Sequence, residues 1–213
     1  MRVSLIGPGD LEFHYKELLG LTAKQLDSEL EKIAKTLVEA NSEIELLPDR
    51  GVSFEIAKKY KALGGKKVIG AVPKSDKTFG IDHLKEYINT TINGKPLFDE
   101  IIDSGDWFKH DLIKGLFGDV VLYLGSSPGA DGERHYAVYL YKLMKKFKKG
   151  VEVSGKNIHP EIRVSNNYGI IVYTPFVKAG KLPEEDEAYL EKFGISLYYT
   201  NNVKELKQVI EHL

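Results

Sequence analysis

The chain has 213 residues and a formal net charge of −1, from 30 basic and 31 acidic side chains. This length fits one large domain or one domain with an insertion. A near-neutral chain lacks the basic excess of a general nucleic-acid binder, so we expect no nucleic-acid partner. The apolar runs are much shorter than the roughly 20 residues that span a bilayer, so we expect no membrane segment.

Cysteine is absent, which excludes disulfides, thiolate nucleophiles and cysteine-based metal centres. The six histidines show no metal-ligand spacing, so we predict neither a metal site nor a cofactor. The sequence shows no signal peptide, which favours a cytoplasmic location. Lysine outnumbers arginine 26 to 4, a composition that thermophilic proteins favour and that ordinary composition drift explains equally well.

The first third of the chain repeats an apolar strand, a turn and an amphipathic helix. Strands are predicted at 2–6, 44–47 and 68–72. An extra loop or short helix at 12–21 precedes the first long helix, for which Thr22 and Gln25 have the spacing of a capping box. A second helix is expected to start at Ser53 as its cap and to stop at Gly64-Gly65.

The same alternation resumes after an interruption. Residues 74–97 are predicted to be an insertion with a short helix at 83–88 and a hairpin turn at Asn93-Gly94. Residues 151–167 form a second irregular segment, for which a plain hairpin, a lid and a dimer contact are the alternatives. Further strands are expected at 98–102, 119–124, 169–174 and 195–199. Further helices are expected at 106–117, 133–149 and 184–193 and after Asn202.

Continuously apolar strands are buried on both faces, as in a parallel sheet covered by helices. The sequence therefore predicts one α/β domain over residues 1–213, Rossmann-like, with a mainly parallel sheet and helices on both faces. Right-handed crossovers place every strand-to-helix loop at the carboxyl edge of such a sheet, where ligands bind.

Three small-residue loops are expected at that edge, namely Gly7–Asp10, Pro48–Gly51 and Gly125–Gly132. Small residues let backbone N–H groups approach an anion, and a helix N-terminus adds favourable partial charge. These loops predict a site for a nucleotide or another phosphorylated small molecule. The alternative is that they only connect strands to helices. The candidate binding residues are Gly7, Gly9, Asp49, Arg50, Gly51, Gly125, Ser126, Ser127, Gly129 and Asp131.

Two segments carry a resemblance to a known family. One runs from Gly51 through Gly64-Gly65 to the strand and proline at Val68–Pro73. The other is Leu124–Glu133, which lies without a gap on a motif of Leu-Pro-Gly-Gly-x-Gly-Thr-x-x-Glu. The chain thereby resembles the SLOG superfamily, which includes the Lonely Guy phosphoribohydrolases and the DNA-processing protein A domain. Leu124, Gly129 and Glu133 agree with the motif, whereas Gly125, Ser126, Ser127 and Ala130 depart from it.

The resemblance implies a nucleoside 5′-monophosphate ligand and, in active members, hydrolysis of its N-glycosidic bond. A motif glutamate, here Glu133, acts with an arginine on the preceding helix. The arginine position falls on His110, with Lys109 and Asp111 beside it. We therefore take Glu133 and His110 as catalytic candidates and Lys109 as a further binding residue. The alternatives are a helix N-terminal acid for Glu133 and an ordinary helix residue for His110.

Three functional hypotheses follow from these residues. The first is a nucleotide-binding protein of the SLOG type whose catalytic status is open. The second is a phosphoribohydrolase that uses Glu133 to stabilise an oxocarbenium-like centre or to activate water. The third is a non-enzymatic sensor or interaction module with a nucleotide-like ligand. The resemblance also implies a homodimer, with the aromatic-rich helix 133–149 as a candidate interface and core packing as its alternative role.

Overall fold

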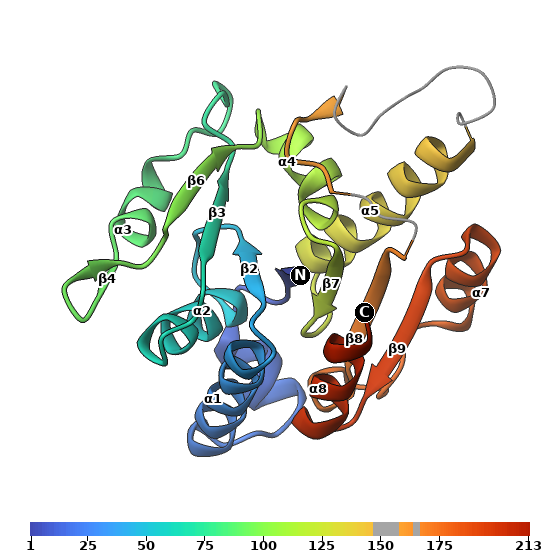
Figure 1. Cartoon of the computed structure of the whole chain (residues 1–213), viewed down its shortest axis with the longest axis horizontal. Helices are drawn as coiled ribbons and strands as arrows, with labels where there is room; N and C mark the ends of the chain where they lie inside the picture. Colours follow the sequence, from blue (N-terminus) through green and yellow to red (C-terminus); the bar gives the residue numbers. More distant parts are fainter. Residues whose placement is uncertain (147–157, 164–166) are drawn as a thin grey trace.

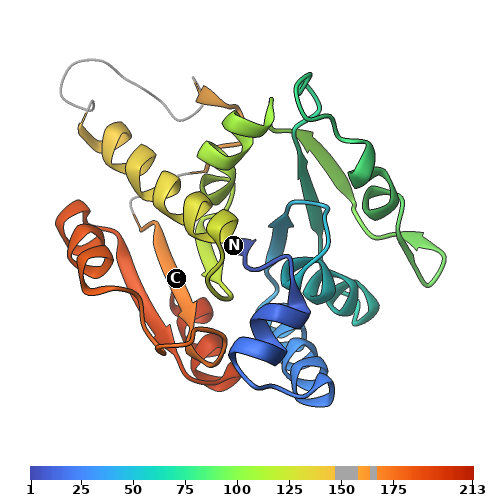
Figure 2. The same ribbon diagram turned by 180° about the vertical axis from the view of Figure 1, so that it is seen from behind.

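The computed structural model describes residues 1–146, 158–163 and 167–213 (Figure 1). These residues contain a seven-stranded sheet in the order β6-β3-β2-β1-β7-β8-β9, in which every pairing is parallel. Helices cover both faces (Figures 1 and 2). The predicted Rossmann-like α/β fold is thus confirmed. The strands are β1 Arg2–Ile6, β2 Glu43–Leu46, β3 Val68–Val72, β6 Glu100–Asp103, β7 Val120–Tyr123, β8 Gly169–Tyr173 and β9 Ser196–Thr200.

The helices also follow the predicted order. The long ones are α1 Ala23–Glu39, α2 Val52–Ala62, α4 Trp107–Ile113, α5 Pro128–Lys146, α7 Glu184–Phe193 and α8 Val203–His212. The short ones are η1 Glu12–Leu18, η2 Asp82–Leu84, α3 Lys85–Ile88, η3 Lys114–Leu116 and η5 Thr174–Phe176. The predicted caps of two helices are present, since Thr22 and Gln25 form a capping box and Asn202 accepts from the N–H groups of Lys204 and Glu205.

Three local predictions were wrong. Gly51, not Ser53, precedes the first residue of α2, and no side chain caps that helix. The helix expected at 106–117 is α4 followed by the tighter turn η3, which starts at Lys114. Helix α5 starts at Pro128, five residues before the expected start, because Ser127 caps it and proline is favourable at a first helical position. Its expected end, Gly150, and most of the irregular segment at 151–167 lie outside the described residues.

The interrupting segment carries the small elements that the sequence predicts. Helix α3 lies within residues 74–97, and β4 Thr91–Ile92 pairs antiparallel with β5 Lys95–Pro96 around Asn93-Gly94. Both turn residues have positive φ, as a two-residue hairpin of this type requires. This hairpin is separate from the main sheet. Among the described residues, no helix is long and apolar enough to cross a membrane.

Each face of the sheet has its own apolar core. One core joins α1, α2 and α8 to side chains such as Val3, Leu5 and Ile44. The other joins α4, α5 and α7 to side chains such as Ile6 and Val121. Because side chains alternate along a strand, Ser4 and Glu45 point to the same face as Ile6. A hydroxyl and a carboxylate are therefore buried beneath α4 and α5.

The topology reverses direction beside β1. The chain runs outward from β1 through β2 and β3 to β6, then returns to form β7 on the other side of β1. The loops after β1 and β7 consequently leave the sheet in diverging directions. Such a switch point, at the carboxyl edge, is where open α/β sheets bind ligands.

Candidate functional site

A cavity of about 200 Å³ lies at the switch point. All three predicted loops contribute to its wall, together with β1, α2, η3 and the start of α5. Eight of the predicted site residues line it: Gly7, Gly9, Asp49, Arg50, Gly51, Ser127, Gly129 and Glu133. The loops therefore converge, as the strand order requires.

Glycines allow the first two loops to touch. Gly51 has a φ of +126°, and a Cβ placed there would lie 2.6 Å from the Pro8 carbonyl oxygen and 2.7 Å from Gly9 Cα. The Val52 N–H donates to that carbonyl at 3.1 Å. A Cβ on Gly7 would lie 2.9 Å from Leu124 Cβ, so the first loop also packs tightly on the end of β7. A side chain at either glycine would separate the walls of the cavity.

The third wall is the N-terminus of α5. Ser127 Oγ accepts from the Ala130 N–H at 3.2 Å, and its carbonyl accepts from the Asp131 N–H at 2.8 Å. A Cβ on Gly129 would have no heavy atom within 4 Å, so this residue borders open space. Pro128 has no N–H, and the Ala130 and Asp131 N–H groups already donate to Ser127, so the Gly129 N–H and the positive end of the helix dipole are what this first turn offers an anion.

Glu133 lies one turn further along α5 and faces a lysine that the sequence analysis did not identify. Lys114 Nζ donates to Glu133 Oε2 at 3.0 Å and to the Leu5 carbonyl at 2.8 Å. Lys114 is only 3% exposed, yet it lines the cavity with Glu133. The available signal was its spacing, four residues after His110 in a predicted helix, which places both on one face.

A buried acid lies beneath this ion pair. Glu45 is fully buried, and its Oε2 accepts from the Ser4 hydroxyl at 2.7 Å. Its Oε1 has no hydrogen-bond partner among the described residues. Burial raises the pKa of Glu45 to about 7, although the nearby Lys114 ammonium opposes that rise.

His110 lies behind the cavity and does not line it. The ring is completely buried, and Nδ1 lies 2.8 Å from the hydroxyl of Ser104. Nε2 lies 4.0 Å from Glu133 Oε1 and has no hydrogen-bond partner in the described part of the chain. Burial, with a contribution from Lys114, lowers the pKa of His110 to about 3. His110 is therefore neutral and cannot supply the positive charge of the arginine whose position it occupies.

Asp111, the neighbour of His110, is exposed but crowded by another acid. Burial of part of its carboxyl group, followed by the charge of Glu133, raises the pKa of Asp111 to about 6. We call Glu45, His110, Asp111, Lys114 and Glu133 the buried polar cluster, of which Asp111 is the exposed member. In it, three acids face one ammonium group and one neutral imidazole.

Four further candidates do not line the cavity. The hydroxyls of Ser126 and Tyr123 donate to the Asp131 carboxylate, which therefore serves the loop itself. Gly125, with a φ of +130°, packs against His14 and the Phe176 carbonyl. Lys109 lies with its aliphatic stem against Gly105. These four residues therefore lie around the cavity but do not line it.

The cavity offers charges of both signs. Arg50 is exposed at its rim, and Asp49 accepts from the Arg50 N–H at 2.7 Å. Lys114 is already neutralised by Glu133. The Arg50 guanidinium and the Gly129 N–H at the start of α5 are the groups that attract an anion here, whereas the Glu133 carboxylate lines the same cavity with a negative charge.

Comparison with known proteins identifies related folds. No family model matches the chain, and no curated protein matches it in sequence. Among solved structures, the molybdenum cofactor carrier protein of Chlamydomonas reinhardtii is similar, with a TM-score of 0.58, 17% identity and 99% and 96% of the two chains covered. The structural-genomics target TM1055 gives 0.60, 15% identity and 100% and 99% coverage.

A third similar structure is the molybdenum cofactor binding protein of the phototrophic bacterium Rippkaea orientalis. It has a TM-score of 0.56 and 13% identity, and the match covers 99% of this chain and 95% of that one. At these identities the similarity concerns the fold. The chain therefore has an α/β fold in common with three proteins, two of which are named for carrying or binding the molybdenum cofactor.

Proposed function

We propose that this protein binds a phosphorylated small molecule, with nucleotides as the first class to test, in the cavity at the switch point. The observation that carries the proposal is the convergence of three strand-to-helix loops and one helix N-terminus on a single cavity. Membership of the SLOG type is part of the proposal. It rests on the sequence motifs and is compatible with the fold.

The phosphate is placed at the first turn of α5, beside Gly7 and Gly9. Backbone N–H groups at a helix N-terminus bind phosphate without a dedicated basic side chain. Arg50 adds a guanidinium group, whose planar donors match phosphate oxygens. Open space at Gly129 leaves room for the anion to approach the helix.

The similar structures suggest a second ligand to test. Two of them are named for carrying or binding the molybdenum cofactor. That cofactor therefore belongs in the ligand panel beside nucleoside monophosphates, as a candidate for the same cavity.

The buried polar cluster favours a protein that binds its ligand without hydrolysing it. Lys114 holds Glu133 from the protein side, and neutral His110 stands where the resemblance implies an arginine. The phosphoribohydrolase alternative keeps one supporting observation, which is that Glu133 lines the cavity. The sensor alternative requires the same binding and differs only in the downstream effect of the bound ligand.

The binding test uses two glycines of α5. Gly129 and Gly132 both have open space at Cβ, but only Gly129 lines the cavity. We expect AMP, another nucleoside monophosphate or the molybdenum cofactor to raise the melting temperature by about 5–10 °C at a hundredfold excess over Kd. Gly129→Leu should abolish the shift, whereas Gly132→Leu should retain it.

Two outcomes would contradict this proposal. One is the absence of any shift with the whole panel at millimolar concentration, and the other is an equal shift in both leucine variants. Release of free base is measured in the same samples. Release that disappears in Glu133→Gln would favour the phosphoribohydrolase, and a shift without release would favour a carrier or sensor.

A further inference from the structure

Three potential metal ligands meet where α4 packs against α5. His110, Asp111 and Glu133 each offer one ligand atom, and these atoms all lie within 4.8 Å of one another. Acidic side chains often gather without binding a cation, so their proximity alone carries little weight. The imidazole provides the second, independent observation.

Neither neutral form of His110 is satisfied by its surroundings. If Nε2 carries the proton, a fully buried N–H lacks an acceptor among the described residues. If Nδ1 carries it, the proton points at Ser104 Oγ and the Nε2 lone pair faces Glu133 Oε1 at 4.0 Å. Burial makes either arrangement costly. A cation between Nε2 and Oε1 would satisfy both atoms.

Lys114 and Ser104 contact other atoms of the two side chains, so His110 Nε2 and Glu133 Oε1 remain available to bind an ion. Lys114 Nζ donates to Oε2 of Glu133, so Oε1 remains directed toward His110. Ser104 contacts the other ring nitrogen, and such a partner orients the imidazole of a metal-binding histidine. Asp111 supplies a second carboxylate from the solvent side, where an ion can enter. Asp111 and Glu133 together carry more negative charge than Lys114 offsets.

We propose that His110, Asp111 and Glu133 bind one divalent transition-metal ion. One imidazole nitrogen and two carboxylate oxygens suit the ions from Mn²⁺ to Zn²⁺ and lack the thiolates of a structural zinc site. Three protein ligands leave at least one coordination position for water or a ligand. This site contradicts our expectation from histidine spacing, because the third ligand comes from a different helix.

The proposal goes beyond the binding of a phosphorylated molecule and does not depend on it. The metal ligands lie behind the cavity wall, and only Glu133 belongs to both sites. Metal affinity is therefore measured on protein free of any phosphorylated ligand. Failure of either proposal leaves the other intact.

The test titrates tag-free, EDTA-treated and dialysed protein with Zn²⁺ by calorimetry and with Co²⁺ by visible absorption. We expect one site per chain and Co²⁺ bands of a nitrogen- and oxygen-ligated ion. Asp111→Asn and His110→Gln should each weaken metal binding by roughly 100-fold or more. Loss of a residue that only orients a ligand costs about 10–100-fold, and loss of a ligand itself should cost at least as much. His135→Ala, which removes a half-exposed histidine elsewhere on α5, should leave the affinity unchanged.

Two results with the wild type and Asp111→Asn would overturn the proposal, and a third concerns the His135→Ala control. One is the absence of a saturable equimolar site in the wild type. The other is wild-type affinity in Asp111→Asn, an exposed substitution that leaves the core intact. Circular dichroism checks the fold of His110→Gln, and if that variant unfolds, Asp111→Asn decides the question. Loss of the site in His135→Ala alone would assign the metal to the surface instead.

Discussion

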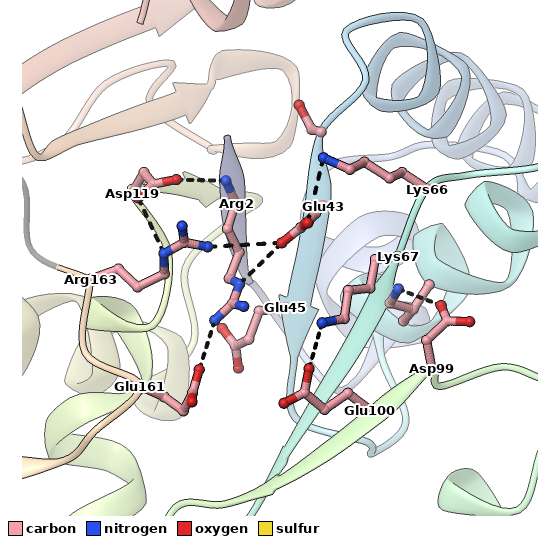
Figure 3. Close-up of polar contacts among 12 residues, drawn as sticks. Arg2, Glu43, Glu45, Lys66, Lys67, Asp99, Glu100, Asp119, Glu161 and Arg163 are labelled. Carbon is pink, nitrogen blue, oxygen red and sulfur yellow. Dashed lines mark hydrogen bonds and ion pairs between the residues drawn. The ribbon is translucent and has the colours of Figure 1, made fainter.

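Charged groups at the amino edge of the sheet are matched in number, whereas those behind the carboxyl edge are not. At the amino edge (Figure 3), Arg2 pairs with Glu43 and Glu161, at 3.6 and 3.4 Å. Arg163 pairs with Glu43 and with Asp119. We call the amino-edge network the set of four basic and four acidic residues Arg2, Lys66, Lys67, Arg163, Glu43, Glu100, Asp119 and Glu161.

The buried polar cluster has the opposite character. Its three acids face one ammonium group, and Glu45 is also near the Arg2 guanidinium of the amino edge (Figure 3). Glu45 Oε1 and His110 Nε2 lack hydrogen-bond partners among the described residues, as does Arg2 Nε, which still pairs with Glu43 at 3.6 Å. Buried polar groups without partners cost free energy, and strongly shifted pKa values gather at functional sites. The comparison teaches that charge matching marks the edge that supports the fold, while charge mismatch marks the edge that we propose binds ligands.

The largest effect is expected at Lys114. Lys114→Met removes the partner of Glu133 and of the Leu5 carbonyl, and it should lower the free energy of unfolding by about 3 kcal/mol at pH 7. Urea denaturation of metal-free protein measures this loss. Lys66→Met, in the amino-edge network, serves as the control and should change stability by less than about 1 kcal/mol. Equal losses in both variants would remove the contrast between the two regions.

Glu45 should make stability depend on pH. Its folded pKa of about 7 exceeds the ordinary 4.5, so the folded state holds the proton more tightly between these values. The stability that the folded state gains from this tightly held proton is fully present below pH 4.5 and is lost as pH rises through 7. Glu45→Gln should therefore gain stability relative to the wild type, on the order of 2–3 kcal/mol between pH 5 and pH 8.

Denaturation midpoints across this pH range measure the Glu45 effect. Glu31→Gln, at an exposed position of α1, provides the matched control and should show no such trend. A parallel pH dependence of Glu45→Gln and the wild type would mean that the Glu45 carboxyl group does not retain its proton in the folded protein.

The smallest effect is expected in the amino-edge network. Glu161→Gln removes one partner of Arg2, but Glu161 is about one-third exposed and Arg2 keeps Glu43. The loss should be below about 1 kcal/mol and should shrink further in high salt. Thermal unfolding at low and high ionic strength measures it. A loss as large as that of Lys114→Met would show that this network is equally sensitive.

Local patterns predicted most of the fold because each element carries its own signal. The apolar strands, the Thr22 capping box and the Asn93-Gly94 turn depend on neighbouring residues alone. The convergence of the loops followed from strand order, a general rule of parallel sheets. Ser127 and Pro128 are a cap and a favourable first residue for α5, but Gly129 and Gly132 are poor helix formers and obscured this early start.

The candidate site was predicted only where it consists of loops. The buried polar cluster depends on how α4 and η3 pack against α5. The spacing of His110 and Lys114 indicates that they share a face, but no spacing in the sequence pairs that face with Glu133 or Glu45. Ser4 and Glu45 come from two strands that are neighbours only in the folded sheet. Lys114 reaches Glu133 because the chain tightens at η3, where the sequence suggested a continuous helix. Side-chain partnerships across elements are therefore the part that required coordinates.

The contact between the first two loops at Gly51 has an evolutionary consequence. Because Gly51 lies directly against the backbone of Pro8 and Gly9, the second loop cannot acquire a side chain at residue 51 without displacing the first loop. Asp49 and Arg50 border the cavity outside that contact, so a change in the proposed ligand is compatible with substitutions there. We expect relatives with different ligands to vary at these two positions and to keep Gly51.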